Sequence, residues 1–74
     1  MKVNDVYFAD LSPAVGNEIS GVRQCKIVKI YEDDMVKVRP MGINYKTGAF
    51  VFLDKHERVI STKRLREKVI KLNG

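Results

Sequence analysis

Three kinds of side chain in this sequence could take part in chemistry: carboxylates, a single histidine, and cations near one end. Asp10 and Glu18 could form a carboxylate pair for acid–base work, or Asp10 could instead hydrogen-bond the backbone of the turn that follows it. His56, the only histidine, lies in a polar turn, where a catalytic role and a plain surface role are both open. No group of His, Cys, Asp and Glu has metal-site spacing, so we predict no metal.

The positive charge is concentrated in the last part of the chain. Residues 1–54 contain seven Lys/Arg and seven Asp/Glu, whereas residues 55–74 contain seven Lys/Arg and two Asp/Glu, which accounts for the net charge of +5. A localised group of cations suits a polyanionic partner such as nucleic acid, and a solvated basic face is the alternative.

Length and composition predict one small domain over residues 1–74. A chain of 74 residues builds only a modest core, and dimerisation is one way to bury more surface. The apolar content of 45% and charged content of 31% are those of an ordinary globular protein. No apolar run reaches the roughly 20 residues that cross a bilayer, and the first residues do not resemble a signal peptide. A single cysteine, Cys25, excludes an internal disulfide and suits a reducing cytoplasm; its apolar surroundings favour a structural role.

Alternating apolar residues predict a mainly β chain. We expect a strand over Val3–Leu11, with Phe8 in the core and Tyr7 on the opposite face, followed by a loop over residues 12–22. A second strand covers Arg23–Tyr31, with Cys25 and Ile27 pointing inward.

The remaining elements follow from turn residues and shorter apolar runs. Glu32–Asp34 is a tight turn, Met35–Met41 a strand with Val36 and Val38 on one face, and residues 44–48 a second turn. Further strands are expected over Ala49–Leu53, Arg58–Ile60 and Val69–Leu72, with one helical turn over Ser61–Leu65, capped by Ser or Thr. This pattern predicts a small SH3-like barrel of five to six strands with one short helical turn before the last strand; an OB-like barrel is the alternative.

Two segments also resemble a known family. The run Asp5–Pro13 (DVYFADLSP), continued by Val15-Gly16, Glu18 and Gly21-Val22-Arg23, resembles the opening of the MazF/PemK toxins. Arg58–Leu65 resembles the strand and turn that precede the last barrel strand of that family. The resemblance implies an SH3-like barrel that forms a homodimer, cleaves single-stranded RNA without a metal by means of the RNA's 2′-hydroxyl, and is neutralised by an antitoxin peptide in the RNA groove.

The resemblance also assigns roles to residues. Arg23 occupies the position of the catalytic arginine, and its guanidinium would stabilise negative charge on the phosphorus oxygens during attack by the 2′-hydroxyl. The loop before it would form one wall of the groove, where Gly16 and Gly21 would permit close approach to RNA. The predicted RNA-binding residues are Ser12, Asn17, Glu18, Gly21, Gln24, Tyr45, Lys46, Lys63 and Arg64.

The sequence departs from the family at two functional positions. Gln24 replaces the proline that follows the arginine, and the segment Val38–Gly42 has no Thr or Ser for the second catalytic residue. The first hypothesis is therefore an RNA-binding MazF/PemK-like module whose endoribonuclease activity is retained, impaired or lost. The second is a non-enzymatic SH3-like module that contacts nucleic acid or a protein such as an antitoxin, and the third is an inactive toxin relic. No cofactor is expected.

Overall fold

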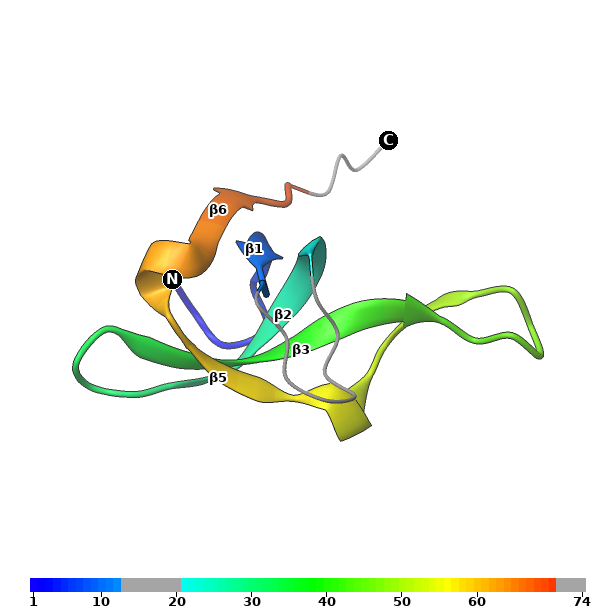
Figure 1. The fold of residues 1–74 in the computed structure, drawn as a ribbon, viewed down its shortest axis with the longest axis horizontal. Helices are drawn as coiled ribbons and strands as arrows, with labels where there is room; N and C mark the ends of the chain where they lie inside the picture. The colour runs from blue at the N-terminus through cyan, green and yellow to red at the C-terminus, as the bar shows by residue number, and fades with distance from the viewer. Residues whose placement is uncertain (13–20, 71–74) are drawn as a thin grey trace.

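The computed structural model describes residues 1–12 and 21–70, which form six antiparallel strands and two short 3-10 turns (Figure 1). The elements in chain order are β1 (Val6–Asp10), β2 (Val22–Ile30), β3 (Met35–Ile43), β4 (Phe50–Phe52), η1 (Asp54–His56), β5 (Arg58–Ser61), η2 (Thr62–Arg64) and β6 (Leu65–Lys68). The prediction of a mainly β chain is therefore confirmed, and η2 is the helical turn that was predicted directly before the last strand.

The strands pair in the order β4-β3-β2-β1-β6, and β5 pairs with the first part of β3. The outer edge of β3 changes its partner at Pro40: residues before it pair with β5 and residues after it with β4. A proline fits this position because it has no N–H to donate to a ladder. Within the described residues no ladder joins β5 to β6, so the sheet is not closed and the predicted SH3-like barrel is not confirmed.

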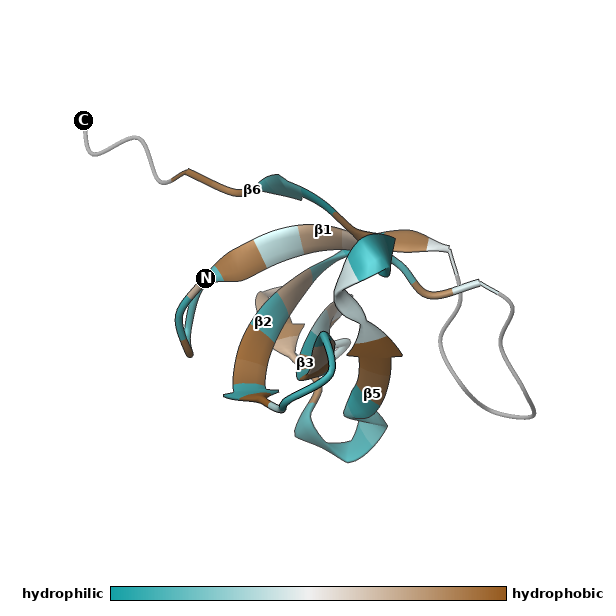
Figure 2. Cartoon of the chain, turned by 90° about the vertical axis from the view of Figure 1, so that its left-hand side faces the viewer, coloured by the Kyte–Doolittle hydropathy of each residue, from teal (hydrophilic) through white to brown (hydrophobic). Residues whose placement is uncertain are grey.

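One face of the strands forms the core. Its buried members, all 4% exposed or less, are Ala9, Leu11, Cys25, Ile27, Val36, Val38 and Ile60. These residues alternate along β1, β2 and β3, as expected for strands with one face buried, and Figure 2 shows apolar stretches of these strands and of β5 around a common interior. Tyr7 packs against this cluster together with Leu65. The prediction for β1 was therefore wrong: Ala9 and Leu11 fix the inward face, so Tyr7 points inward and Phe8 outward.

Several predicted boundaries also need correction. The first strand begins at Val6 rather than Val3, and β3 continues through Pro40 to Ile43 because β4 pairs with its last three residues. The last strand covers Leu65–Lys68 instead of Val69–Leu72, and Leu72 lies outside the described residues. Pairing of Leu65 with Ala9 brings its side chain to the core. The rest of β6 is charged, which is common for strands at the edge of a sheet.

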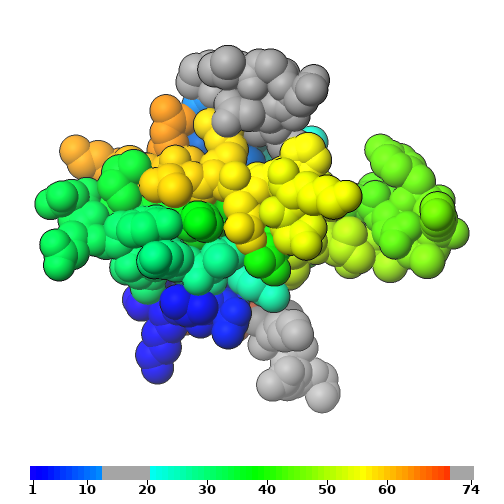
Figure 3. Space-filling view, turned by 90° about the horizontal axis from the view of Figure 1, so that it is seen from below, coloured from blue at the N-terminus to red at the C-terminus, as the bar shows by residue number. Residues whose placement is uncertain are grey.

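Two hairpins extend from opposite ends of β3. The β2–β3 turn has positive φ at Asp33 and Asp34, as type I′ hairpin turns require, and confirms the predicted turn. The β3–β4 hairpin projects from the body of the protein, as the yellow-green segment on the right of Figures 1 and 3 shows. Asn44 closes its tip: its carbonyl accepts the amide of Gly48 at 2.7 Å, and its side chain accepts the amide of Lys46 at 2.9 Å. Gly48 adopts a φ of +74°, which favours glycine.

Candidate nucleic-acid interface

The ends of β1 and β2 are joined by hydrogen bonds that fix the start of β2. The amide of Leu11 donates to the carbonyl of Gly21 at 2.9 Å, and the amide of Gly21 donates to Oγ of Ser12 at 3.1 Å. Gly21 has a φ of +87°, a conformation that side-chain-bearing residues rarely adopt. Arg23 follows two residues later, so this junction positions it. Asn17 and Glu18, predicted to bind RNA, lie outside the described residues, as does Gly16.

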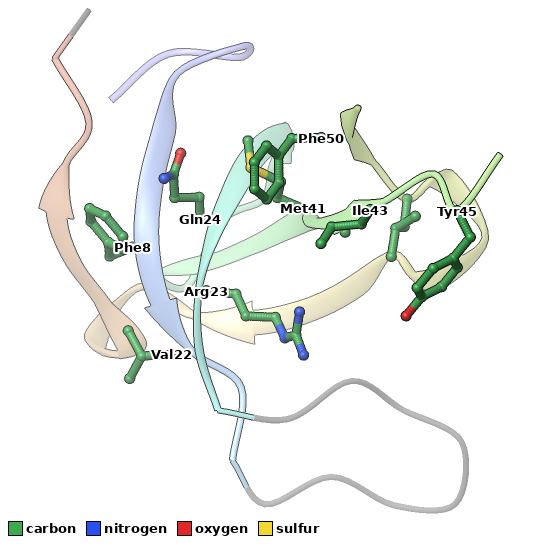
Figure 4. A pocket seen from close by; sticks show the side chains of 10 residues that line it. Phe8, Val22, Arg23, Gln24, Met41, Ile43, Tyr45 and Phe50 are labelled. Carbon is green, nitrogen blue, oxygen red and sulfur yellow. The ribbon is translucent and has the colours of Figure 1, made fainter. Parts of the chain in front are cut away.

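A hollow of about 690 Å³ lies between the start of β2 and the β3–β4 hairpin (Figure 4). Arg23 and Gln24 line it from β2, while Tyr45 and Phe50 line it from the hairpin, with Met41 and Ile43 from β3. Tyr45 is 95% exposed and Phe50 is 70% exposed. Three predicted site residues, Arg23, Gln24 and Tyr45, are therefore brought to one concave surface although Tyr45 is far from the others in sequence.

The chemistry available in this hollow is that of one cation and exposed aromatic rings. A guanidinium binds phosphate through paired hydrogen bonds, and an exposed ring can stack on a nucleic-acid base. Among the described residues that line the hollow, none carries a carboxylate or an imidazole that could move a proton. The arrangement supports binding of an anionic aromatic ligand and assigns no general base.

The other predicted RNA-binding residues do not line this hollow. Ser12 and Gly21 belong to the junction described above, and Lys46 lies exposed in the hairpin turn. Lys63 lies in η2, where Ser61 caps the turn by accepting its amide at 3.2 Å, as predicted for a Ser or Thr. The guanidinium of Arg64 donates to the carbonyl of Ser12 and, at 3.5 Å, to that of Asp10.

A second arginine at the same junction has a role that sequence reasoning missed. Nη1 of Arg58 donates to the carbonyl of the fully buried Leu11 at 2.7 Å. With Arg64, it satisfies three successive carbonyls at the end of β1. No local signal could have shown this, because 47 residues separate Arg58 from Leu11 in sequence.

Asp10 holds the same turn through its side chain. Its Oδ1 accepts the amide of Ser12 at 3.0 Å, which confirms the turn-holding interpretation, and its Oδ2 lies 3.7 Å from Arg66. The Ser12 amide, followed by the charge of Arg66, lowers the pKa of Asp10 below its ordinary value. An ionised carboxylate with these partners is suited to structure rather than to donating a proton.

The remaining candidates for chemistry occupy different surroundings. Cys25 is fully buried in the core, in agreement with the structural role predicted for it, and burial raises the pKa of its thiol to about 11. His56 lies in η1 and does not line the hollow. No group of three or more His, Cys, Asp and Glu side chains in residues 1–12 and 21–70 is arranged to hold a metal ion.

No protein-family model matches the chain, and no curated protein matches it significantly. In the described part of the chain, no helix is long and apolar enough to cross a membrane. A functional assignment therefore depends on the hollow itself and on the sequence resemblance described above.

Proposed function

We propose that this protein is a MazF/PemK-like module that binds single-stranded RNA in the hollow between β2 and the β3–β4 hairpin. The observation that supports it is that Arg23 and the exposed rings of Tyr45 and Phe50 line the same concave surface. The sequence resemblance independently assigns a phosphate-binding role to Arg23.

The ligand class follows from the combination of charge and ring surface. A ring that is 95% exposed contributes little to the core, so Tyr45 has its face available for a partner. Bases of a single strand are free to stack on such a ring, whereas those of a duplex are already stacked on one another. Arg23 supplies the cation for the adjoining phosphate, and Gln24 supplies donors and acceptors for a base edge.

Binding is better supported than cleavage. The resemblance implies attack by the RNA's 2′-hydroxyl with Arg23 stabilising the charged phosphorane. The described lining residues include no carboxylate or imidazole to take the proton of that hydroxyl, and Val38–Gly42 contains no Ser or Thr. A homodimer, an antitoxin-like peptide and a cytoplasmic setting stay predictions from the sequence.

A second candidate is a non-enzymatic module that binds a protein through the same surface. It is favoured by the apolar share of the exposed residues, since Ile43 is 46%, Val22 50% and Phe50 70% exposed. Aromatic residues are enriched at protein interfaces, and the buried core of an interface is more apolar than the rest of a protein surface. Binding of a peptide that is indifferent to Arg23 and to salt would favour this candidate.

The direct test measures the affinity for a fluorescent single-stranded RNA by anisotropy at several salt concentrations. We expect binding that weakens steeply with salt. Arg23→Met should lower affinity about 10-fold and reduce the salt dependence by about one phosphate contact, because it removes one cation. Tyr45→Ala should cost about 1–3 kcal/mol of binding free energy through lost stacking, while the matched Tyr45→Phe keeps the ring and most of the affinity.

The same samples test cleavage. Products with 2′,3′-cyclic phosphate ends, formed without added metal and lost in Arg23→Met, would establish the endoribonuclease. Intact RNA that stays bound would establish a binding module. Absence of binding at low salt would overturn the proposal.

A further inference from the structure

We propose a second nucleotide subsite, formed by Lys26 and Phe52, that continues the RNA path beyond the first hollow. The inference rests on the proposed function and extends it. It concerns a separate hollow of about 600 Å³ on the outward face of the sheet, which draws residues from β1, β2, β3, β4 and β6.

The two hollows adjoin each other. Gln24 and Met41 line both of them, so a ligand that leaves the first hollow past these side chains enters the second. Lys26 follows Arg23 by three residues along β2, so the two side chains project from opposite faces of the strand, and Gln24 shares the face of Lys26. The path between the hollows therefore runs past Gln24 and Met41, and a single strand of RNA that follows it meets Arg23 in the first hollow and Lys26 in the second.

The second hollow pairs a cation with an aromatic ring. Nζ of Lys26 lies 4.9 Å from the centroid of the Phe52 ring, so the ammonium is positioned by a cation–π contact. Phe52 pairs with Met41 across β3 and β4, which keeps the ring at the boundary between the two hollows. A base can pack against Met41 beside Phe52, while Lys26, which lies over the Phe52 ring, contacts the phosphate.

The charge of the second hollow favours an anion. Lys68 lines it from β6, and Asp5 is the one carboxylate among the described residues that line it. Asp5 already has partners: its Oδ2 accepts the backbone amide of Lys2 at 2.9 Å and lies 3.5 Å from Nζ of Lys68. Because Lys68 is paired with Asp5, the charge of Lys26 gives the hollow a net positive charge, which complements a phosphodiester.

The test compares RNA lengths in wild type and Lys26→Met. A series of single-stranded oligonucleotides, from a dinucleotide upward, should gain affinity in the wild type until both subsites are filled. Lys26→Met should bind the shortest RNA normally, lose several-fold affinity for the longer ones, and show a salt slope on longer RNA that is lower by about 0.7, the value for one phosphate on a single strand. Lys26→Arg keeps the charge and should restore the gain with length.

Lys29→Met is the matched control. Lys29 lies on the same strand as Lys26, and its Nζ is 5.0 Å from the centroid of the Tyr31 ring, so it makes the same kind of contact without lining either hollow. Equal losses in Lys26→Met and Lys29→Met, or an unchanged length dependence in Lys26→Met, would overturn the second subsite. If Arg23→Met still weakens all lengths in that case, the proposed function stands. Absence of RNA binding at every length would overturn both.

Discussion

Two sets of cations in this protein differ in what they contact. Arg58 and Arg64, from the basic C-terminal part, direct their guanidinium groups to main-chain carbonyls at the end of β1. Arg23 and Lys26, from the part in which charges cancel, line the two hollows. Residues 55–74, which carry the net charge, therefore contribute no residue to the first hollow among its described lining residues. The distribution of charge along the sequence does not by itself locate a binding surface.

The largest expected effect is on stability, when the junction at the end of β1 loses Arg58. Arg58→Met keeps much of the side chain's apolar length but removes the donor to the carbonyl of Leu11. A hydrogen bond from a charged group contributes about 1.5–3 kcal/mol, so we expect a loss of that size in the free energy of unfolding, measured by urea denaturation. Arg64→Met should cost less, because Ser12, one of its two partners, is exposed.

Arg66→Met is the control for this comparison. Its side chain is 60% exposed and lies 3.7 Å from Asp10, so its loss should change stability by no more than about 1 kcal/mol. If Arg58→Met and Arg66→Met unfold at the same urea concentration, the hydrogen bond from Arg58 to the carbonyl of Leu11 does not stabilise the junction as proposed.

Local patterns were enough to predict most of the strands. Alternation around Cys25 and Ile27, and around Val36 and Val38, identified β2 and β3 because each strand has one buried face. The same reasoning failed for β6, since Leu65–Lys68 contains one apolar residue and three charged ones. Only its pairing with β1 makes that segment a strand, and pairing between distant segments is not a local property.

The candidate site was predicted in part for a similar reason. Arg23 and Gln24 are adjacent in sequence, and the family resemblance drew attention to both. Tyr45 joins them because β3 continues past Met41, where the strand was predicted to end, to Ile43, and leads into the hairpin that carries Tyr45. The roles of Arg58 and Arg64 could be found only from the tertiary structure. Nothing in the sequence distinguishes an arginine that donates to a distant carbonyl from one that is exposed to solvent.

A smaller effect is expected when the charge of Asp10 is removed at the same junction. Folding lowers the pKa of Asp10 from its ordinary 3.8, so its carboxylate stabilises the protein above that pH and the contribution is lost as pH falls through the lower folded-state value. Asp10→Asn keeps an oxygen acceptor for the Ser12 amide but not the charge. We expect Asp10→Asn to unfold at a lower urea concentration than the wild type at neutral pH, and the two midpoints to converge in acid.

Asp54→Asn serves as the reference for that pH series, because Asp54 is an exposed carboxylate in η1. Its urea midpoint should follow that of the wild type more closely at every pH. A difference between Asp10→Asn and the wild type that persists undiminished in acid would show that the amide, not the missing charge, disturbs the turn.

The smallest effect is expected for Lys63, which tests whether basic residues outside the hollows contribute to RNA binding. Lys63 is exposed in η2 and lines neither hollow, so Lys63→Met should change RNA affinity less than twofold and leave the salt slope nearly unchanged. The reason is that an exposed charge that makes no direct contact with the ligand is weakened by salt screening. Anisotropy titrations of Lys63→Met beside Arg23→Met make the comparison directly. A loss in Lys63→Met as large as in Arg23→Met would mean that RNA follows the basic C-terminal face, and that the hollows are not where it binds.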